Sequence, residues 1–457
     1  MNNLYQNKNV LVLGLAKSGF YAAKLLNELG ARVTVNDAKD LSQDVRAKEL
    51  EKLGIRIISG GHPVDLFEDD YDLMVKNPGI PYENSAVKKA LAENLPIITE
   101  VELAFKVMKG HFIGITGSNG KTTTTRMIQE MLATNRSEGK AYAIGNIGVA
   151  ASEVALKTEA MDDLIVELSS FQLMGTPTIR PEIAIITNIT EAHLDYHGTR
   201  ENYVAAKLNL IQNQTKEDIL IYNEDQAGLK ELLQSKSSAQ LIPFSIHTYL
   251  EEGASIKDHS IYFKKEKIAD VSDVFIKGKH NLANFLAAIA VAKIKNISNH
   301  QIKKVLREFK GVKHRTQFVV EWEDRVFYND SKATNIEATE KALAGFSQPV
   351  VLLAGGLDRG YDFKELIPSF KKHVKGLIVM GETAERMKCV AKSAGLTNIQ
   401  EKKEMIAAVE TAYQMSRPGD VILLSPAAAS WDQYENFEIR GERFIEAIDY
   451  LIKKDGN

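Results

Sequence analysis

Short apolar runs alternate with longer amphipathic stretches along most of the chain. The first run, Val10–Leu13, enters a turn that contains glycine, and a helical pattern then continues to Leu29. A second apolar run follows at Arg32–Asn36. Short apolar runs bounded by turn residues predict buried strands, and the amphipathic stretches between them predict helices. This repetition of strand and helix predicts an α/β fold built on parallel sheets.

The pattern restarts twice, at His111 and near Gln317. We therefore expect α/β domains over residues 1–99, 100–311 and 312–457, with joints near Glu100 and Gly311. A long apolar helix is expected from Asn281 to Ile294. The other expected strands are Leu73–Lys76, Phe112–Ile115, Leu164–Leu168, Ile183–Thr187, Ile219–Tyr222, Arg325–Tyr328, Val350–Leu353, Leu377–Met380 and Val421–Leu424.

Composition adds limits on the class of protein. The chain has 457 residues, 44% hydrophobic and 26% charged, which is typical of a globular protein with several domains. A net charge of -3 argues against a general nucleic-acid surface. The single cysteine, Cys389, excludes an internal disulfide and fits a reducing compartment. With no apolar signal core and no run of membrane-spanning length, we expect a cytoplasmic protein.

The strongest chemical motif is Gly114-Ile-Thr-Gly-Ser-Asn-Gly-Lys-Thr-Thr-Thr-Thr125, between an expected strand and an amphipathic run. Backbone N–H groups in such a loop can hold phosphate oxygens, Lys121 can reach the terminal phosphates, and Thr122 can hold Mg²⁺. Ile115 stands where the general pattern has glycine, so Gly117 and Gly120 frame a tighter turn. The position at a strand-to-helix junction favours a nucleotide site over a glycine-rich turn with a chance lysine.

A weaker motif, Gly14-Leu-Ala-Lys-Ser-Gly19, opens the first segment. Ala16 replaces the middle glycine of the dinucleotide fingerprint, and its methyl group would crowd a pyrophosphate. Asp37 lies near the position of a ribose-binding acid. An NAD site, a site for another nucleotide-linked ligand and a purely structural turn all remain open. Asn77-Pro-Gly-Ile80 follows a strand, at the edge where α/β sheets bind ligands.

Three further polar groups follow the phosphate loop. Glu167 ends an expected buried strand, where it needs a partner such as Mg²⁺ or a salt bridge. His193 and His197 are spaced i, i+4, but Leu194 replaces the glutamate of the zinc-protease motif, so His193 is either a metal ligand or a structural histidine. Lys207, taken alone on its expected helix, is a surface lysine.

Later motifs are polar segments after expected strands. Asn281 and Asn284, one helical turn apart, can read a base edge, or Asn281 can cap the helix. Arg315 and Lys332 can bind an anion. Small residues in Ser425-Pro-Ala-Ala-Ala-Ser430 allow close approach of a ligand, or form an ordinary loop.

Together these motifs resemble the Mur ligase family over essentially the whole chain. Asn329-Asp-Ser-Lys-Ala-Thr-Asn335 and Ser425–Phe437 are similar to the members that add D-glutamate. The other matching pieces are Gly117-Ser-Asn-Gly-Lys-Thr-Thr123, Glu167-Leu-Ser-Ser-Phe-Gln172, His193, Ala205-Ala-Lys-Leu208, His280-Asn281 and Arg315.

The resemblance implies a Rossmann-like UDP-binding domain, a central P-loop ATPase-type domain and a C-terminal Rossmann-like domain for the amino acid. It implies that ATP phosphorylates the carboxylate of UDP-N-acetylmuramoyl-L-alanine and that the amine of D-glutamate attacks the acyl phosphate. It also implies two Mg²⁺ ions and a carbamylated Lys207. We expect a monomer without nucleic-acid or membrane partners.

The resemblance also implies roles for individual residues. The implied catalytic residues are Lys121, His193, Lys207 and Lys332. The residues implied to contact ATP are Gly117, Ser118, Asn119, Gly120, Lys121, Thr122, Thr123, Asn281, Arg315 and Asp330. The implied metal ligands are Thr122, Glu167, His193 and Lys207. The residues implied to bind the UDP-linked substrate are Leu15, Ala16, Asp37, Asn77, Gly79 and Asn146. Those implied to bind D-glutamate are Lys332, Thr334, Arg359, Ser430 and Phe437, with Arg359 in place of a lysine found in some members.

Three other functions fit parts of the sequence. Another amide ligase, such as a folylpolyglutamate synthase, would use the same ATP chemistry. An NAD-dependent oxidoreductase would use the Gly14–Gly19 turn, against which Ala16 counts. A non-catalytic nucleotide-binding module would leave Glu167, His193 and Lys332 without a role.

Overall fold

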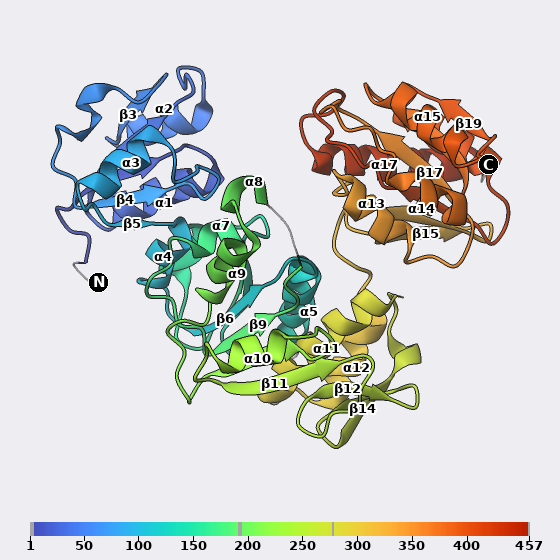
Figure 1. Ribbon diagram of the computed structural model, residues 1–457, viewed down its shortest axis with the longest axis horizontal. Helices are drawn as coiled ribbons and strands as arrows, with labels where there is room; N and C mark the ends of the chain where they lie inside the picture. The colour runs from blue at the N-terminus through green and yellow to red at the C-terminus, as the bar shows by residue number, and fades with distance from the viewer. Residues whose placement is uncertain (1–3, 135, 191–193, 277, 456–457) are drawn as a thin grey trace. The chain divides into compact units, whose positions relative to one another are not determined.

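The computed structural model describes residues 4–134, 136–190, 194–276 and 278–455. The chain forms two compact units, of which the first contains Met1–Val274 and His280–Arg307 and the second contains Phe275–Lys279 and Glu308–Asn457. The first unit holds a five-stranded and a nine-stranded sheet, and the second holds a six-stranded sheet (Figure 1). The chain therefore has three α/β domains.

The five-stranded sheet is parallel throughout, in the order β3-β2-β1-β4-β5. The strand order reverses at β1, so the turns after β1 and β4 lie next to each other at the carboxyl edge, where such sheets bind ligands. Its strands are β1 (Asn9–Leu13), β2 (Arg32–Asp37), β3 (Arg56–Ser59), β4 (Leu73–Lys76) and β5 (Ile97–Ile98). Its helices are α1 (Lys17–Glu28), α2 (Val45–Lys52) and α3 (Ser85–Ala92).

In the nine-stranded sheet, β6 (His111–Thr116) pairs with β8 on one side and β9 on the other. The full order is β14-β13-β12-β11-β10-β9-β6-β8-β7. The other parallel strands are β7 (Ala141–Gly145), β8 (Asp163–Glu167), β9 (Ile183–Ile186), β10 (Ile219–Asn223) and β11 (Gln240–Ser245). An antiparallel extension is formed by β12 (Ala254–Lys257), β13 (Ser260–Phe263) and β14 (Glu266–Asp270).

The helices of this domain connect its strands and carry much of the site described below. They are α4 (Glu100–Phe105), α5 (Lys121–Ala133), α6 (Ala151–Val154), α7 (Ser170–Leu173), α8 (Leu194–His197), α9 (Arg200–Leu208), α10 (Leu229–Gln234), α11 (Lys279–Ile294) and α12 (Asn299–Glu308). One cluster of buried apolar side chains runs from Val10 in the first sheet through Val101 in α4 to Phe112 in the second sheet. The first two domains therefore share a core, which holds their loops together.

The third sheet has the order β15-β16-β20-β17-β18-β19. Leu352 belongs to one buried cluster, whereas its neighbours Val351 and Leu353 belong to another. Both faces of β17 are therefore covered, which explains its continuous apolar sequence. The elements are β15 (Gln317–Trp322), β16 (Arg325–Asn329), α13 (Ile336–Leu343), β17 (Val350–Gly355), α14 (Leu366–His373), β18 (Val374–Met380), α15 (Ala384–Ser393), β19 (Ile399–Glu401), α16 (Met405–Met415), β20 (Val421–Leu424) and α17 (Phe437–Asp455).

Each strand expected from an apolar run is present, with ends shifted by a few residues. The antiparallel extension was not predicted, because its strands are short and carry several charges. Its first hairpin turns at Asp258 and His259, both with positive φ, and this pair is a weak hairpin signal compared with Asn-Gly. In the described parts of the chain, none of the helices combines the length and apolar character needed to cross a bilayer.

Candidate active site

The phosphate loop joins β6 to α5 at the carboxyl edge of the second sheet. Gly120 caps α5 with φ +83°, and a Cβ atom there would lie 2.2 Å from Asn284 Oδ1. Gly117 has φ +151°, and a Cβ atom there would lie 2.0 Å from Thr187 Oγ1. No side chain caps α5. The first N–H groups of a helix lack acceptors within that helix, so this helix start is suited to phosphate oxygens.

Two lysines meet on one carbonyl oxygen of this loop. Lys121 Nζ donates to Gly117 O over 2.7 Å, and Lys207 Nζ donates to the same oxygen over 2.8 Å. Lys207 lies on α9 and is only 1% exposed. Its Nζ atom lies 4.6 Å from the ring centroid of Tyr203, and the Tyr203 hydroxyl is 2.8 Å from Ser118 Oγ. The prediction from local pattern, a surface lysine, is therefore wrong.

The surroundings of Lys207 change its protonation. Burial, together with the nearby charge of Lys121, lowers the pKa of Lys207 from 10.5 to about 6. An amine with this pKa is mostly neutral at pH 7, and a neutral amine is a nucleophile. The phosphate loop therefore has beside it a buried lysine whose lowered pKa favours the neutral amine.

Glu167 ends β8 and is 1% exposed. Its Oε1 accepts a hydrogen bond from Asn146 Nδ2 over 2.9 Å, whereas its Oε2 is buried without a hydrogen-bond partner. No ion pair to Glu167 occurs among the described residues, which removes the salt-bridge alternative there. A buried carboxylate oxygen without a donor is expensive unless a cation binds it. This oxygen therefore fits contact with a divalent cation, and Thr122 lies in the first turn of α5, directly after the phosphate loop.

Two other predicted residues near the loop have different outcomes. His193 lies outside the described residues. Within those residues, no group of three or more His, Cys, Asp or Glu side chains is arranged to hold a metal ion. Asn281 lies inside α11, which begins at Lys279, so the alternative that Asn281 caps this helix is wrong. Asn281 and Asn284 are both buried, and Asn284 contacts the position of Gly120.

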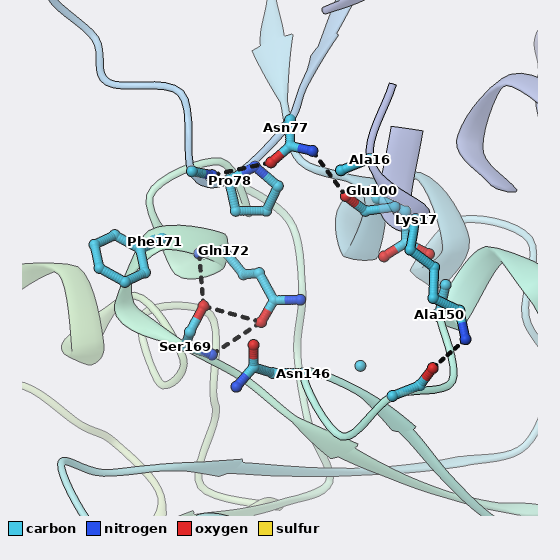
Figure 2. Close-up of a pocket in the computed structure, with 14 residues that line it drawn as sticks. Ala16, Lys17, Asn77, Pro78, Glu100, Asn146, Ala150, Ser169, Phe171 and Gln172 are labelled. Atoms are coloured by element: carbon cyan, nitrogen blue, oxygen red, sulfur yellow. Dashed lines mark hydrogen bonds between the residues drawn. The ribbon is translucent and has the colours of Figure 1, made fainter. Parts of the chain in front are cut away.

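A cavity of about 360 Å³ lies at the carboxyl edge of the first sheet, between the first and second domains. Figure 2 shows Asn77 and Pro78 on one side of it and Gln172 and Asn146 on the other. The cavity is lined by Ala16, Lys17, Ser18, Asn77, Pro78, Gly79, Glu100, Gly145, Asn146, Gly148, Ala150, Ser169, Phe171 and Gln172.

Glu100 stands out among these lining residues because it is 2% exposed. Its Oε1 accepts a hydrogen bond from Ser152 N over 2.5 Å, and burial raises the pKa of its carboxyl group. Sequence reasoning treated Glu100 only as a domain joint. Its contribution could not be read locally, because the cavity is closed by residues from two domains.

In the second unit, the two polar motifs lie side by side. Asp330 Oδ2 accepts from Ser425 Oγ over 2.8 Å, and Asp330 Oδ1 accepts from Thr316 N over 3.0 Å. Burial raises the pKa of Asp330 from 3.8 to about 6. Arg440 on α17 is also buried, and its guanidinium donates to Ser331 O over 2.8 Å and to Ala428 O over 3.1 Å. Arg440, which sequence reasoning missed, thus joins the two motifs.

Side chains with aromatic contacts surround these motifs. Lys332 Nζ lies 5.3 Å from the ring centroid of Phe437. The guanidinium of Arg359 lies 4.9 Å from the ring centroid of Trp431, the residue after Ser430. Thr334 N donates to Lys332 O over 2.9 Å. The Nε atom of Arg315 is buried without a hydrogen-bond partner. The second unit therefore presents several cations that an anionic ligand can engage.

Comparisons with known proteins match the whole chain. Models of the Mur ligase MurD-like N-terminal domain, the Mur ligase middle domain and the Mur ligase glutamate ligase domain match residues 8–99, 115–292 and 314–428. The UDP-N-acetylmuramoylalanine--D-glutamate ligase of Lactiplantibacillus plantarum is 53% identical over 450 residues, 98% of each chain. That of Enterococcus faecalis is 54% identical over 452 residues, 99% of this chain and 98% of the relative. The chain belongs to the Mur ligase family.

Solved Mur ligases share the fold. MurC from Thermotoga maritima has a TM-score of 0.58 at 19% identity and covers 97% of this chain and 99% of its own. MurF from Thermotoga maritima, solved in complex with ADP, has a TM-score of 0.57 at 16% identity. The match covers 100% of this chain and 97% of the MurF chain. Mur ligases use ATP.

The residues that the Mur ligase resemblance assigns to the UDP-linked substrate fall into two groups. Ala16, Asn77, Gly79 and Asn146 line the cavity. Leu15 and Asp37 do not line it: Leu15 is buried, and its backbone N–H donates to Asp37 Oδ2 over 2.7 Å. Asp37 therefore supports the turn that carries Ala16.

Proposed function

We propose that this chain is an ATP-dependent amide ligase that joins D-glutamate to UDP-N-acetylmuramoyl-L-alanine in peptidoglycan precursor synthesis. The observation that carries the proposal is the identity of 53% and 54% to ligases of that name over nearly the full length of both chains. The phosphate loop, the buried lysine beside it and the adjoining cavity support the same chemistry.

The reaction has two steps. A carboxylate oxygen of the alanyl substrate attacks the terminal phosphorus of ATP, ADP leaves, and an acyl phosphate forms. The neutral amine of D-glutamate then attacks the acyl carbon and loses a proton, and inorganic phosphate leaves as the amide bond forms. The first step requires two anions to approach each other, so the site must offset negative charge.

Residues at the phosphate loop can supply that offset. Gly117, Ser118, Asn119, Gly120, Thr122 and Thr123 surround the phosphates, and Lys121 adds a positive charge. The backbone N–H groups of Ser118 and Asn119 donate to Asn188 O and Asn188 Oδ1 over 2.9 Å and 3.0 Å, so the N–H donors for phosphate come from the start of α5. Thr122 and Glu167 would hold one Mg²⁺, and His193 and carbamylated Lys207 would serve a second. Bound Mg²⁺ supplies positive charge to the reacting phosphate oxygens. The orphaned Oε2 atom of Glu167 is the observation that supports the first metal contact.

The remaining contacts divide among the three domains. The UDP-linked substrate occupies the cavity at Ala16, Asn77, Gly79 and Asn146, with Leu15 and Asp37 supporting that turn. Asn281, Arg315 and Asp330 serve the rest of the nucleotide. D-glutamate is bound by Lys332, Thr334, Arg359, Ser430 and Phe437. We place the enzyme in the cytoplasm. We also expect it to be a monomer, and light scattering of the purified protein tests this oligomeric state.

An amino-acid screen tests the function. Purified protein with ATP, Mg²⁺ and UDP-N-acetylmuramoyl-L-alanine should release phosphate when D-glutamate is added. L-glutamate, D-aspartate and a folate substrate serve as comparison arms. Lys121→Met is the matched inactive control, because methionine keeps the length of the side chain and removes its charge. Phosphate release with another amino acid or with folate, and none with D-glutamate, would refute the proposal.

A further inference from the structure

The loop after β4 is held from behind by a buried cation. Lys76, the last residue of β4, is 0% exposed. Its Nζ donates to Ile80 O over 2.6 Å, to Asn77 O over 3.2 Å and to Pro78 O over 3.4 Å. Three carbonyl groups of one short loop therefore converge on a single ammonium group.

A tyrosine from the second domain reaches the same loop. Tyr196 lies on α8, and its hydroxyl group is within donating distance of two carbonyl oxygens, Ile80 O at 3.0 Å and Pro78 O at 3.1 Å. The same hydroxyl oxygen lies 3.5 Å from Lys76 Nζ. The Tyr196 ring packs edge-on against Phe171, with centroids 4.6 Å apart. Because Phe171 lines the cavity from the second domain, Tyr196 connects both sides of it.

This arrangement has an electrostatic consequence for the cavity. Asn77, Pro78 and Gly79 line it, whereas Lys76 and Tyr196 do not. The carbonyl oxygens of Asn77, Pro78 and Ile80 are turned toward the buried ammonium and hydroxyl groups by these hydrogen bonds. Carbonyl oxygens carry partial negative charge and are therefore unfavourable neighbours for a phosphate group. Because these hydrogen bonds turn the carbonyl oxygens away from the cavity, an anionic ligand can approach the loop without meeting them.

The cation itself brings no ion pair to the fold. No salt bridge to Lys76 occurs in the part of the chain that the structure describes, and Lys76 Nζ lies 4.8 Å from the ring centroid of Tyr82. Burial lowers the pKa of Lys76 to about 8. A buried cation without an acidic partner costs stability unless hydrogen bonds compensate it, and the carbonyl groups of this loop supply those hydrogen bonds.

We propose that Lys76 and Tyr196 are positioning residues that hold the loop of residues 77–80 in the shape that binds the UDP-linked substrate. The inference rests on the proposed function for the identity of that substrate. Neither residue takes part in the chemical step, so their removal acts on the affinity for this one substrate.

Two variants and a matched control test this inference. Tyr196→Phe removes only the hydroxyl and keeps the ring on Phe171, and Lys76→Met removes the charge at similar length. Tyr82→Phe is the control, because the Tyr82 hydroxyl also crosses between the domains, donating to Met174 O over 3.2 Å, but does not bind the loop. For each protein, the KM values for the UDP-linked substrate, ATP and D-glutamate are measured together with the thermal midpoint.

Tyr196→Phe and Lys76→Met should each raise the KM for the UDP-linked substrate about tenfold. Each variant removes hydrogen bonds that hold the carbonyl groups of the loop, and a change of about tenfold is the usual size of the effect of losing one such bond. The KM values for ATP and D-glutamate should stay unchanged, as should every KM of Tyr82→Phe. An unchanged KM for the UDP-linked substrate in both variants would overturn the inference, as would a common rise in all three KM values with a lower thermal midpoint.

Failure of the proposed function gives a different result. In that case the wild-type protein releases no phosphate with D-glutamate. Calorimetric titration with UDP-N-acetylmuramoyl-L-alanine then tests the loop without catalysis. Tenfold weaker binding by the two variants than by wild type supports the inference, whereas equal binding, or no binding by wild type, refutes it.

Discussion

Lys207 should capture carbon dioxide as a carbamate, and activity should depend on that reaction. The perturbation is Lys207→Met, which keeps the length of the side chain and removes the amine. In the wild-type protein, the amine donates to Gly117 O beside Lys121 and is 1% exposed. Addition of CO₂ to a neutral amine, with loss of a proton, gives an anion, which suits a group near Mg²⁺ and the Lys121 ammonium.

The magnitude follows from the pKa of Lys207. At the ordinary lysine pKa of 10.5, roughly one side chain in a few thousand is neutral at pH 7. With the pKa lowered to about 6, the neutral form predominates at pH 7. The concentration of reactive amine therefore rises on the order of a thousandfold. Below pH 6 the amine is protonated, so carbamate and activity should both decline as the pH falls from about 7 to about 5.

The assay combines phosphate release with carbon-13 NMR. Protein prepared in CO₂-free buffer should lose activity and regain it when bicarbonate is added, and labelled bicarbonate should produce a carbamate resonance. Lys207→Met should show neither the resonance nor the recovery, whereas the exposed-lysine control Lys48→Met should show both. Lys207→Ala should also be inactive with bicarbonate, and short carboxylic acids are the rescue reagents to test. Near-wild-type turnover by Lys207→Met would refute the reasoning.

Three other predictions concern single buried groups. Glu167→Gln should abolish the thermal stabilisation by Mg²⁺ and ATP. The variant without nucleotide should be at least as stable as the wild type, because Glu167 Oε2 has no hydrogen-bond donor. A lower thermal midpoint of the nucleotide-free variant in scanning fluorimetry would contradict this. Because the pKa of Asp330 is about 6 in the fold and 3.8 ordinarily, stability should fall as pH rises between these values, by up to about 1.4 kcal/mol per unit. Urea unfolding of Asp330→Asn should lack that slope, and equal slopes would rule the idea out. Gly120→Ala should lose about 1 kcal/mol or more of stability and weaken ATP binding, because Gly120 has φ +83° and the added Cβ atom would lie 2.2 Å from Asn284 Oδ1. Wild-type affinity for ATP in calorimetry would count against this prediction.

Local sequence was sufficient for the central parallel strands and the phosphate loop, whereas the parallel strands β3, β5, β7, β11 and β19 were not predicted. The apolar run that became β6, the glycines at 117 and 120 and the helix start at Lys121 lie within a few residues of each other. Signals of this kind depend on backbone conformation and on burial of one element, so spacing along the chain carries them. The hairpins of the second sheet were missed because their short, charged strands depend on pairing with each other.

The state of the site residues was decided by packing between distant segments. Lys207 has the local sequence of a surface lysine, and it is buried because α9 docks on a loop 90 residues away in sequence. Glu167 meets Asn146 because β7 and β8 pair with Gly145 opposite Glu167. Lys76 and Tyr196 come from different domains that share one core.

The amino-acid sequence by itself therefore determined the most apolar strands, the phosphate loop and the family resemblance, because each rests on residues close together in the chain. The tertiary structure alone decided which lysine is buried, which carboxylate lacks a donor and which loops close the cavity. Burial and partner distance set the pKa and the free energy of a charged group, and both are properties of the folded chain.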